Sequence, residues 1–154
     1  MRVVVLIGTI VVVLSTAANL LHGFAHQGQQ VMSFPAWQWA YILSVIYVAP
    51  VVAAALLWTR YQRVGAWLLF ASMAGSLVFG LAYHFLIPGV DNAFTLQPGA
   101  WRITFRVSAA LVFLLQGIGS VVGVWALNVL SPFRTIGSTA GLSSTWQDPR
   151  KESR

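Results

Sequence analysis

The chain has 154 residues, of which 58% are hydrophobic and only 8% are charged. A soluble globular domain carries about 25% charged residues, so the composition excludes that class. The mean hydropathy of +0.76 likewise excludes a disordered chain. The net charge is +6, but the cations stand singly or in pairs between apolar runs, so they do not indicate a nucleic-acid partner. An integral membrane protein, with the lipid bilayer as its partner, is the class that remains.

Four stretches of the sequence are long and apolar enough to cross a membrane as helices, which takes about 20 residues each. They cover about residues 3–24, 37–58, 64–87 and 103–130, and the only charged residue within them is Arg106. We therefore expect an all-α integral membrane protein with a four-transmembrane-helix bundle over residues 1–131. Residues 132–154 are rich in Ser, Thr, Gly and charged residues, which predicts a polar, flexible cytoplasmic tail.

The first stretch also resembles a secretory signal, because Arg2 precedes an apolar run that contains the small residues Ser15 and Ala17. The apolar run nevertheless continues past Ala18 to Phe24. We therefore expect a retained transmembrane helix rather than a cleaved signal.

The distribution of cations predicts the orientation of the helices in the membrane. Arg2, the pair Arg60 and Arg63, and Arg134 fall on one side if the chain crosses four times, and the tail adds three more cations there. Lys and Arg are enriched in cytoplasmic connections, so both termini should be cytoplasmic. The connections at about residues 25–36 and 88–102 should then lie on the outer side.

Small residues in the third and fourth stretches predict close helix packing. Gly119 and Gly123 form a GxxxG step, and Ala71 with Gly75 forms a weaker one. The sequence leaves open whether these contacts lie within one chain, between the copies of a homo-oligomer, or with partner membrane subunits. Pro50, near the middle of the second stretch, lacks a backbone donor and predicts a kink.

Polar residues within the stretches recur at helical spacing. Ser15, Asn19 and His22 follow one stripe of the first helix, and Ser76 and His84 belong to a similar stripe of the third. Gln116 and Ser120 form a third stripe in the fourth helix. Because unsatisfied polar groups are costly in hydrocarbon, these stripes should face one another and form hydrogen bonds between helices.

The three histidines of the chain are all expected at the outer end of the helices. His22 and His26 are four residues apart, which turns both rings to one side of a helix, and His84 reaches a similar depth on a parallel helix. Three imidazoles with an open position suit zinc or copper. Asp91, in the outer connection, is a candidate fourth ligand.

Other interpretations of the same histidines remain open at this point. His22 or His26 could pair with His84 as axial ligands of haem b, with Gly23 and Gly80 providing room, although the chain has no cysteine and hence no CxxCH motif. Alternatively, the three rings could simply lie at the membrane interface and form hydrogen bonds with carbonyls.

Arg102 and Arg106 are exceptional as outer-side arginines. They are one turn apart, and an ion pair of either with Asp91 would clamp the outer connection over the helices. An unpaired arginine would instead contact an anion or a lipid headgroup.

Two functions are consistent with these features. In the first, the protein binds a transition metal or haem through His22, His26 and His84 as a redox or metal-dependent membrane subunit. In the second, it is a non-catalytic accessory or scaffolding subunit of a larger membrane complex. No acidic residue falls within the spans, which argues against a proton pump or cation pathway.

Overall fold

The computed structural model describes residues 1–131, and all regular structure within them is helical. Within this range, four helical segments are long and apolar enough to cross a membrane, and they overlap the four predicted stretches. The predicted tail at 132–154 lies outside the described residues.

Two of the four segments are interrupted by π-helix, which is labelled η here. The segments consist of α1 (Arg2–Gly28); α2 (Ala36–Tyr41), η1 (Ile42–Val48) and α3 (Ala49–Leu57); α4 (Gln62–Leu81) and η2 (Ala82–Leu86); and α5 (Arg102–Val129). In a π-helix the backbone bonds run between residues five apart, and short π segments are frequent at functional sites.

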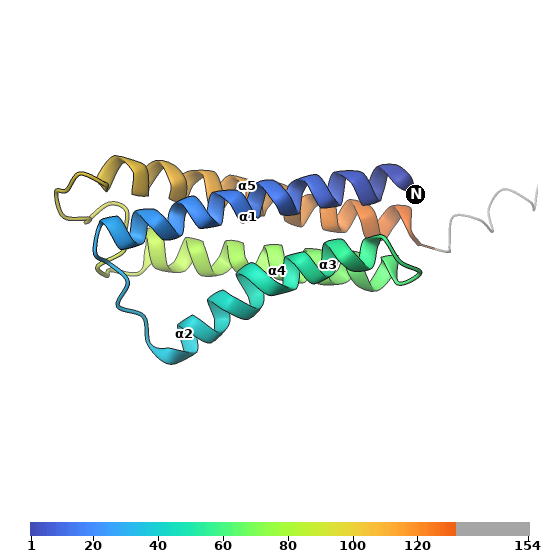
Figure 1. The fold of residues 1–154 in the computed structure, drawn as a ribbon, viewed down its shortest axis with the longest axis horizontal. Helices are drawn as coiled ribbons and strands as arrows, with labels where there is room; N and C mark the ends of the chain where they lie inside the picture. The colour runs from blue at the N-terminus through green and yellow to red at the C-terminus, as the bar shows by residue number, and fades with distance from the viewer. Residues whose placement is uncertain (132–154) are drawn as a thin grey trace, which may run out of the picture.

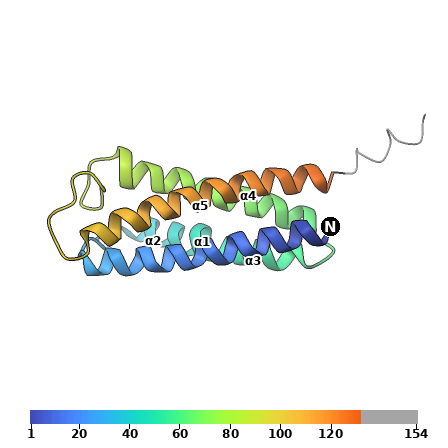
Figure 2. The same cartoon turned by 90° about the horizontal axis from the view of Figure 1, so that it is seen from above.

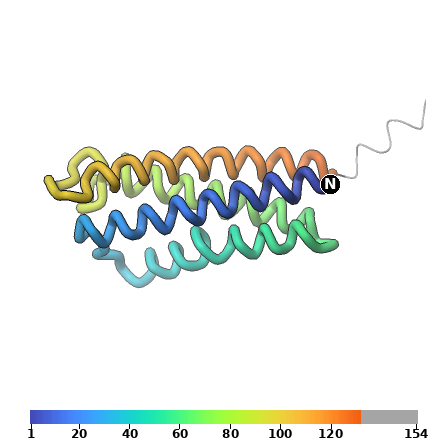
Figure 3. The backbone as a smooth tube through the Cα atoms, turned by 45° about the horizontal axis from the view of Figure 1, so that its top comes forward, coloured from blue at the N-terminus to red at the C-terminus, as the bar shows by residue number. Residues whose placement is uncertain are grey.

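The four segments lie side by side, and segments that follow one another in the chain run in opposite directions (Figure 1). The N-terminus and the last turn of α5 lie at the same end, as the view from above also shows (Figure 2). The tube in Figure 3 shows the two longer connections, residues 29–35 and 87–101, together at the other end. We call this second end the histidine end, because it contains all three histidines.

Apolar side chains fill the space between the helices at the end opposite the histidines. This core consists of Val4, Val5, Val11, Val12, Ala53, Leu57, Ala66, Leu69, Met73 and Ala126. Residues from α1, α3, α4 and α5 contribute to it, so the core fixes how the four segments pack there.

The GxxxG step of α5 is a contact within this chain. A Cβ atom on Gly123 would lie 2.7 Å from the Cα of Phe70, and one on Gly119 would lie 2.8 Å from Met73 Cγ. Both glycines therefore let α4 and α5 approach closely, which is how small residues hold membrane helices together. The weaker step, Ala71 and Gly75, does not pack α4 against α5 in this way. Ala71 is exposed, and Gly75 faces the Tyr41 hydroxyl of the second segment.

Pro50 lies in the first turn of α3, directly after η1. The missing proline donor is thus accommodated by a stretch of π-helix on its N-terminal side. Beyond this point α2 diverges from the other helices towards the histidine end (Figure 1). The divergence opens the helices near the histidines.

The polar stripes are buried, but their serines do not bridge helices as predicted. Ser76 donates to the Ser72 carbonyl at 2.7 Å, and Ser120 donates to the Gln116 carbonyl at 2.8 Å, both within one helix. A hydroxyl can bond the carbonyl four residues back, and this satisfies it without a partner helix. Ser76 and Ser120 therefore give no hydrogen bond to the side chains of the facing stripes, whereas Ser15 accepts from Asn19 within α1.

Candidate metal centre

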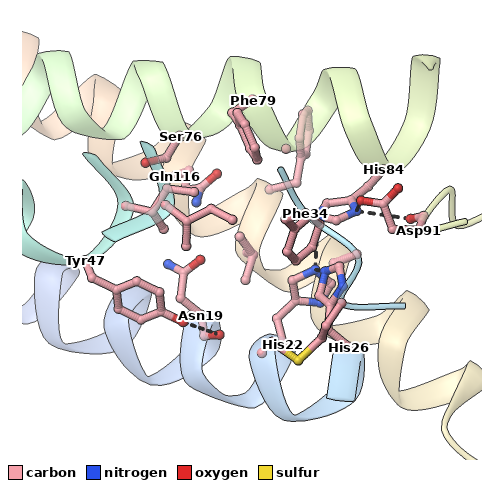
Figure 4. A pocket seen from close by; sticks show the side chains of 18 of the residues that line it. Asn19, His22, His26, Phe34, Tyr47, Ser76, Phe79, His84, Asp91 and Gln116 are labelled. Carbon is pink, nitrogen blue, oxygen red and sulfur yellow. Dashed lines mark hydrogen bonds and ion pairs between the residues drawn. The ribbon is translucent and has the colours of Figure 1, made fainter. Parts of the chain in front are cut away.

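The three histidine side chains converge at the histidine end. His22 Nε2 lies 3.1 Å from His84 Nε2 and 3.1 Å from His26 Nε2, and one nitrogen from each ring lies within 4.8 Å of the others. The residues are only 6%, 5% and 8% exposed for His22, His26 and His84. Figure 4 shows the three rings pointing toward one another from α1 and η2.

The local helix geometry explains this convergence. His22 and His26 lie one turn apart on α1, which places their rings on the same side. On the third segment, each four-residue step of an α-helix overshoots a full turn by about 40°. The wider turn of η2, closed by the Ile87 N–H bond to the Ala82 carbonyl at 2.7 Å, reduces this drift and keeps His84 on the buried side.

The groups behind His22 and His84 determine which ring nitrogens carry protons. Ser108 Oγ lies 2.9 Å from His22 Nδ1, and it accepts from this nitrogen when its own proton goes to the Phe105 carbonyl at 3.0 Å. His84 Nδ1 lies 3.2 Å from the Asp91 carbonyl, which can only accept. His84 therefore holds its proton on Nδ1, and in the arrangement with the Ser108 proton on Phe105 His22 does the same, so that both Nε2 atoms then present a lone pair.

Two lone pairs at 3.1 Å cannot form a hydrogen bond with each other. A shared cation between the nitrogens removes this conflict. Metal-bound histidines commonly donate the other ring N–H to a carbonyl or carboxylate, which fixes the tautomer and the ring orientation. The arrangement at His22 and His84 has this form.

Two of the three distances between the ring nitrogens match those around a small metal ion, and the third pair, His26 and His84, lies within 4.8 Å and would draw together on binding. With metal–nitrogen bonds of about 2.0–2.1 Å, two ligands of a tetrahedral ion lie about 3.3 Å apart. The distances from His22 Nε2 to its two neighbours are close to this value. Three protein ligands leave the fourth position of such an ion free for water or a small molecule.

Aromatic rings enclose the cluster. The Phe105 ring centroid lies 4.9, 4.7 and 5.6 Å from the rings of His22, His26 and His84, and Phe34 packs on His26 at 5.3 Å. These contacts hold the imidazoles in place and exclude water from one side. His26 Nδ1 is buried and has no hydrogen-bond partner within residues 1–131.

Asp91 lies behind His84, not among the converging nitrogens. Its carboxylate Oδ2 is 3.8 Å from His84 Nδ1, on the ring edge that faces away from the cluster, and its backbone carbonyl accepts from the same nitrogen. Burial raises the pKa of the Asp91 carboxyl, and the proximity of His84 opposes this shift. The structure thus places Asp91 behind the His84 ring, and not among the converging nitrogens where a fourth ligand was predicted.

The arginines do not form the predicted ion pair with Asp91. Arg106 instead donates to the backbone carbonyls of Ala93 at 2.6 Å and Phe94 at 3.3 Å, and Arg102 Nε has no partner within the described residues. The Arg106 guanidinium thus contacts backbone carbonyls of the connection, and the Asp91 carboxylate lies beside His84 instead. The connection is therefore clamped to α5, but through its main chain.

A cavity of about 120 Å³ adjoins the cluster and extends toward the middle of the helices. The three histidines and Asp91 line one end, and Asn19, Ser76 and Gln116 lie further along it (Figure 4). The free position of an ion bound by the histidines is thus next to a partly polar chamber.

Sequence reasoning missed the residues that support the histidines. Ser108 lies on the helix opposite His22, and nothing in its spacing relates it to a histidine 86 residues away. Phe105 is one of nine phenylalanines and has no distinguishing local pattern. The position of Ser108 three residues after Phe105 is the only local signal, and it is too common to be informative.

Comparison with protein-family models, with curated proteins and with solved structures finds no match for this chain. The function must therefore be argued from the geometry and chemistry of the site.

Proposed function

We propose that this protein is a membrane protein that binds one divalent transition metal ion, Zn²⁺ or Cu²⁺, through the Nε2 atoms of His22, His26 and His84. The observation that carries the proposal is the convergence of three buried ring nitrogens, with His22 Nε2 at 3.1 Å from the Nε2 atoms of both His84 and His26 and with hydrogen-bond partners behind His22 and His84. Three neutral imidazoles in a nearly dry site suit a borderline-soft ion. A metal-dependent membrane subunit is the role that follows.

The geometry favours a single ion over haem b. Two axial histidines of a haem lie on opposite faces of a macrocycle, whereas the rings of His22 and His84 are in direct contact, with centroids 4.7 Å apart. His26 also contacts His22, so no plane between the rings is free. The adjoining cavity of about 120 Å³ is too small for a macrocycle.

The metal content of the purified protein tests the proposal. We expect about one Zn²⁺ or Cu²⁺ per chain by elemental analysis after purification in mild detergent and equilibration with each ion. A variant with all three histidines replaced by alanine should hold none and keep its helical circular dichroism. Wild-type protein that holds no ion above the level of the triple variant would contradict the proposal and favour the accessory-subunit role.

The Ser108 hydroxyl should tune the affinity for the ion without binding it. Ser108→Ala removes the acceptor that holds the His22 Nδ1 proton, so we expect affinity for Zn²⁺ to fall about 10–100-fold, as is typical for partners of this kind. Competition with a chromophoric chelator measures this change. Ser120→Ala is the matched control on the same helix, because Ser120 bonds only its own helix. Equal affinities in the two variants would refute the role given to Ser108.

The four helices are further proposed to form a transmembrane bundle with both termini in the cytoplasm and the histidine end outside. The supporting argument is the placement of Arg2, Arg60 and Arg63 at the end opposite the histidines. The chain has no cysteine, so a single introduced one reports its own position. In intact cells a membrane-impermeant maleimide should label Gln97→Cys and spare Thr59→Cys, both exposed positions. The reverse pattern would invert the topology.

A further inference from the structure

The far end of the cavity contains a buried carboxamide whose oxygen has no hydrogen-bond partner in the described part of the chain. Gln116 is only 2% exposed, and its Oε1 atom has no hydrogen-bond partner within residues 1–131. Ser76, which lines the cavity beside it, donates its proton to Ser72. An unsatisfied polar group within a membrane-spanning helix is destabilising, so its retention indicates a partner that is not part of the fold.

Two neighbours of Gln116 leave space for such a partner. A Cβ atom on Gly80 would lie 3.7 Å from Gln116 Oε1, so the absence of a side chain there keeps the space in front of the carboxamide open. Asn19 donates its amide protons to Ser15, which leaves its carbonyl oxygen without a bonded partner in the described part of the chain. Carboxamides from α1 and α5 thus both line the cavity.

The cavity has polar groups at two ends and apolar walls between them. Along α5, eight residues separate Gln116 from Ser108, which contacts His22, and this corresponds to about 12 Å of helix. The walls include Trp39, Phe79 and Phe113. In Figure 4, Gln116 and Ser76 lie at the end away from the three histidines.

Size and charge restrict what can occupy this space. The cavity of about 120 Å³ is open at its mouth, so it admits one ring whose substituents can extend into the mouth, and no fused ring system. Asp91 is the only Asp, Glu, Lys or Arg among the lining residues, and it lies at the histidine end. The ligand is therefore neutral at the Gln116 end.

We propose that the cavity binds the head group of a quinone or quinol, with one ring oxygen at the histidine-bound ion and the opposite oxygen at Gln116. A carboxamide donates to a quinone carbonyl and accepts from a quinol hydroxyl, so Gln116 serves both forms without a charge. The metal supplies one of the two polar ends, so this inference rests in part on the proposed function. The Gln116 end is independent of it.

A lipid-soluble ligand also needs a route from the bilayer. Met32 and Trp39 line the cavity and are 38% and 37% exposed, so the cavity reaches the outside of the helices beside α2. This is where the second segment diverges from the others (Figure 1). The hydrocarbon tail of a membrane quinone can leave the cavity there.

Duroquinone, a tailless tetramethylbenzoquinone, and its quinol are the probes for this site. Binding is measured by calorimetry on protein in lipid nanodiscs, with empty nanodiscs as the blank, before and after loading with Zn²⁺. In Gln116→Met, which keeps the length of the side chain, affinity for duroquinone should fall about tenfold while the Zn²⁺ content is unchanged. Asn128→Met, which removes an exposed carboxamide at the far end of α5, is the matched control and should bind normally.

The thermal stability of Gln116→Met separates a ligand-binding from a structural role. The melting temperature without ligand should rise, because the variant removes an unsatisfied buried group. A structural role predicts the opposite sign. Gly80→Leu fills the same end of the cavity and should also abolish binding, which provides a second variant if Gln116→Met does not fold.

The outcomes distinguish this inference from the proposed function. If the wild type holds Zn²⁺ but does not bind duroquinone, or if Gln116→Met and Asn128→Met bind it equally, the quinone site is wrong and the metal site stands. If the wild type holds no ion but binds duroquinone in a manner that depends on Gln116, the metal site is wrong and the quinone site stands.

Discussion

Replacing His22 by alanine is expected to lower the affinity for Zn²⁺ by more than about a hundredfold. Its Nε2 atom is the only one in the cluster that lies 3.1 Å from both of the others, so its loss separates His26 from His84. Groups that merely orient a ligand are worth about 10–100-fold, and a direct central ligand is worth more. Chelator competition on the purified protein measures the change.

The matched control for this variant is Gln27→Ala, an exposed residue near the same end of α1. It should bind Zn²⁺ with wild-type affinity. The affinity of His26→Ala for Zn²⁺ should lie between those of the other two variants. In this variant His22 and His84 stay in contact, and each keeps the group that orients it. A His22→Ala protein that binds as tightly as Gln27→Ala would remove His22 from the site.

Replacing Gly123 by alanine is expected to destabilise the protein by about 2 kcal/mol, which is typical for overpacking in a close contact. The added Cβ would lie within 2.8 Å of three Phe70 atoms, two of which belong to the backbone and cannot move without shifting α4. The change is read from reversible unfolding in detergent.

Gly117→Ala provides a control of opposite sign on the same helix. A Cβ there meets nothing within 4 Å, so only the helix propensity changes, and alanine should stabilise by about 0.5–1 kcal/mol. If both variants lower the stability equally, the close packing of α4 against α5 does not explain the effect.

The four spans were predictable because hydrophobic length is a local property of the sequence. The convergence of His22, His26 and His84 was also predictable, since it needs only the spacing on one helix and the similar depth of two parallel helices. The structure confirms that these three residues could hold one metal ion. The identity of that ion is not a local property, and it stays a prediction.

The environment of the cluster was not predictable for a different reason. The place of Asp91 depends on the backbone path of residues 87–101, where Ala93 N–H donates to the His84 carbonyl and turns the Asp91 carbonyl toward the ring. Charge complementarity predicted an ion pair between Asp91 and an arginine, but Arg106 donates to a main-chain carbonyl of the connection instead. A connection without regular secondary structure has no repeating spacing of its residues, so contacts of this kind cannot be derived from its sequence.

The role of Gln116 was hidden in a similar way. The spacing of Gln116 from Ser120 predicted a hydrogen-bonded polar stripe. The Ser120 hydroxyl, however, donates to the backbone carbonyl of Gln116 and not to its side chain. Only the three-dimensional arrangement shows that the carboxamide remains unsatisfied beside a cavity.

The 87–101 connection packs beside the histidines and is tied at three points: to His84 through Ala93, to Gln29 at the end of α1 through Gln97, and to α5 through Arg106. Phe105 closes the site from another side. We therefore expect a bound ion to leave through the adjoining cavity, the side left open, so that its release slows when a ligand fills that cavity. Exchange of the ion would then depend on what occupies the cavity more than on any movement of the connection.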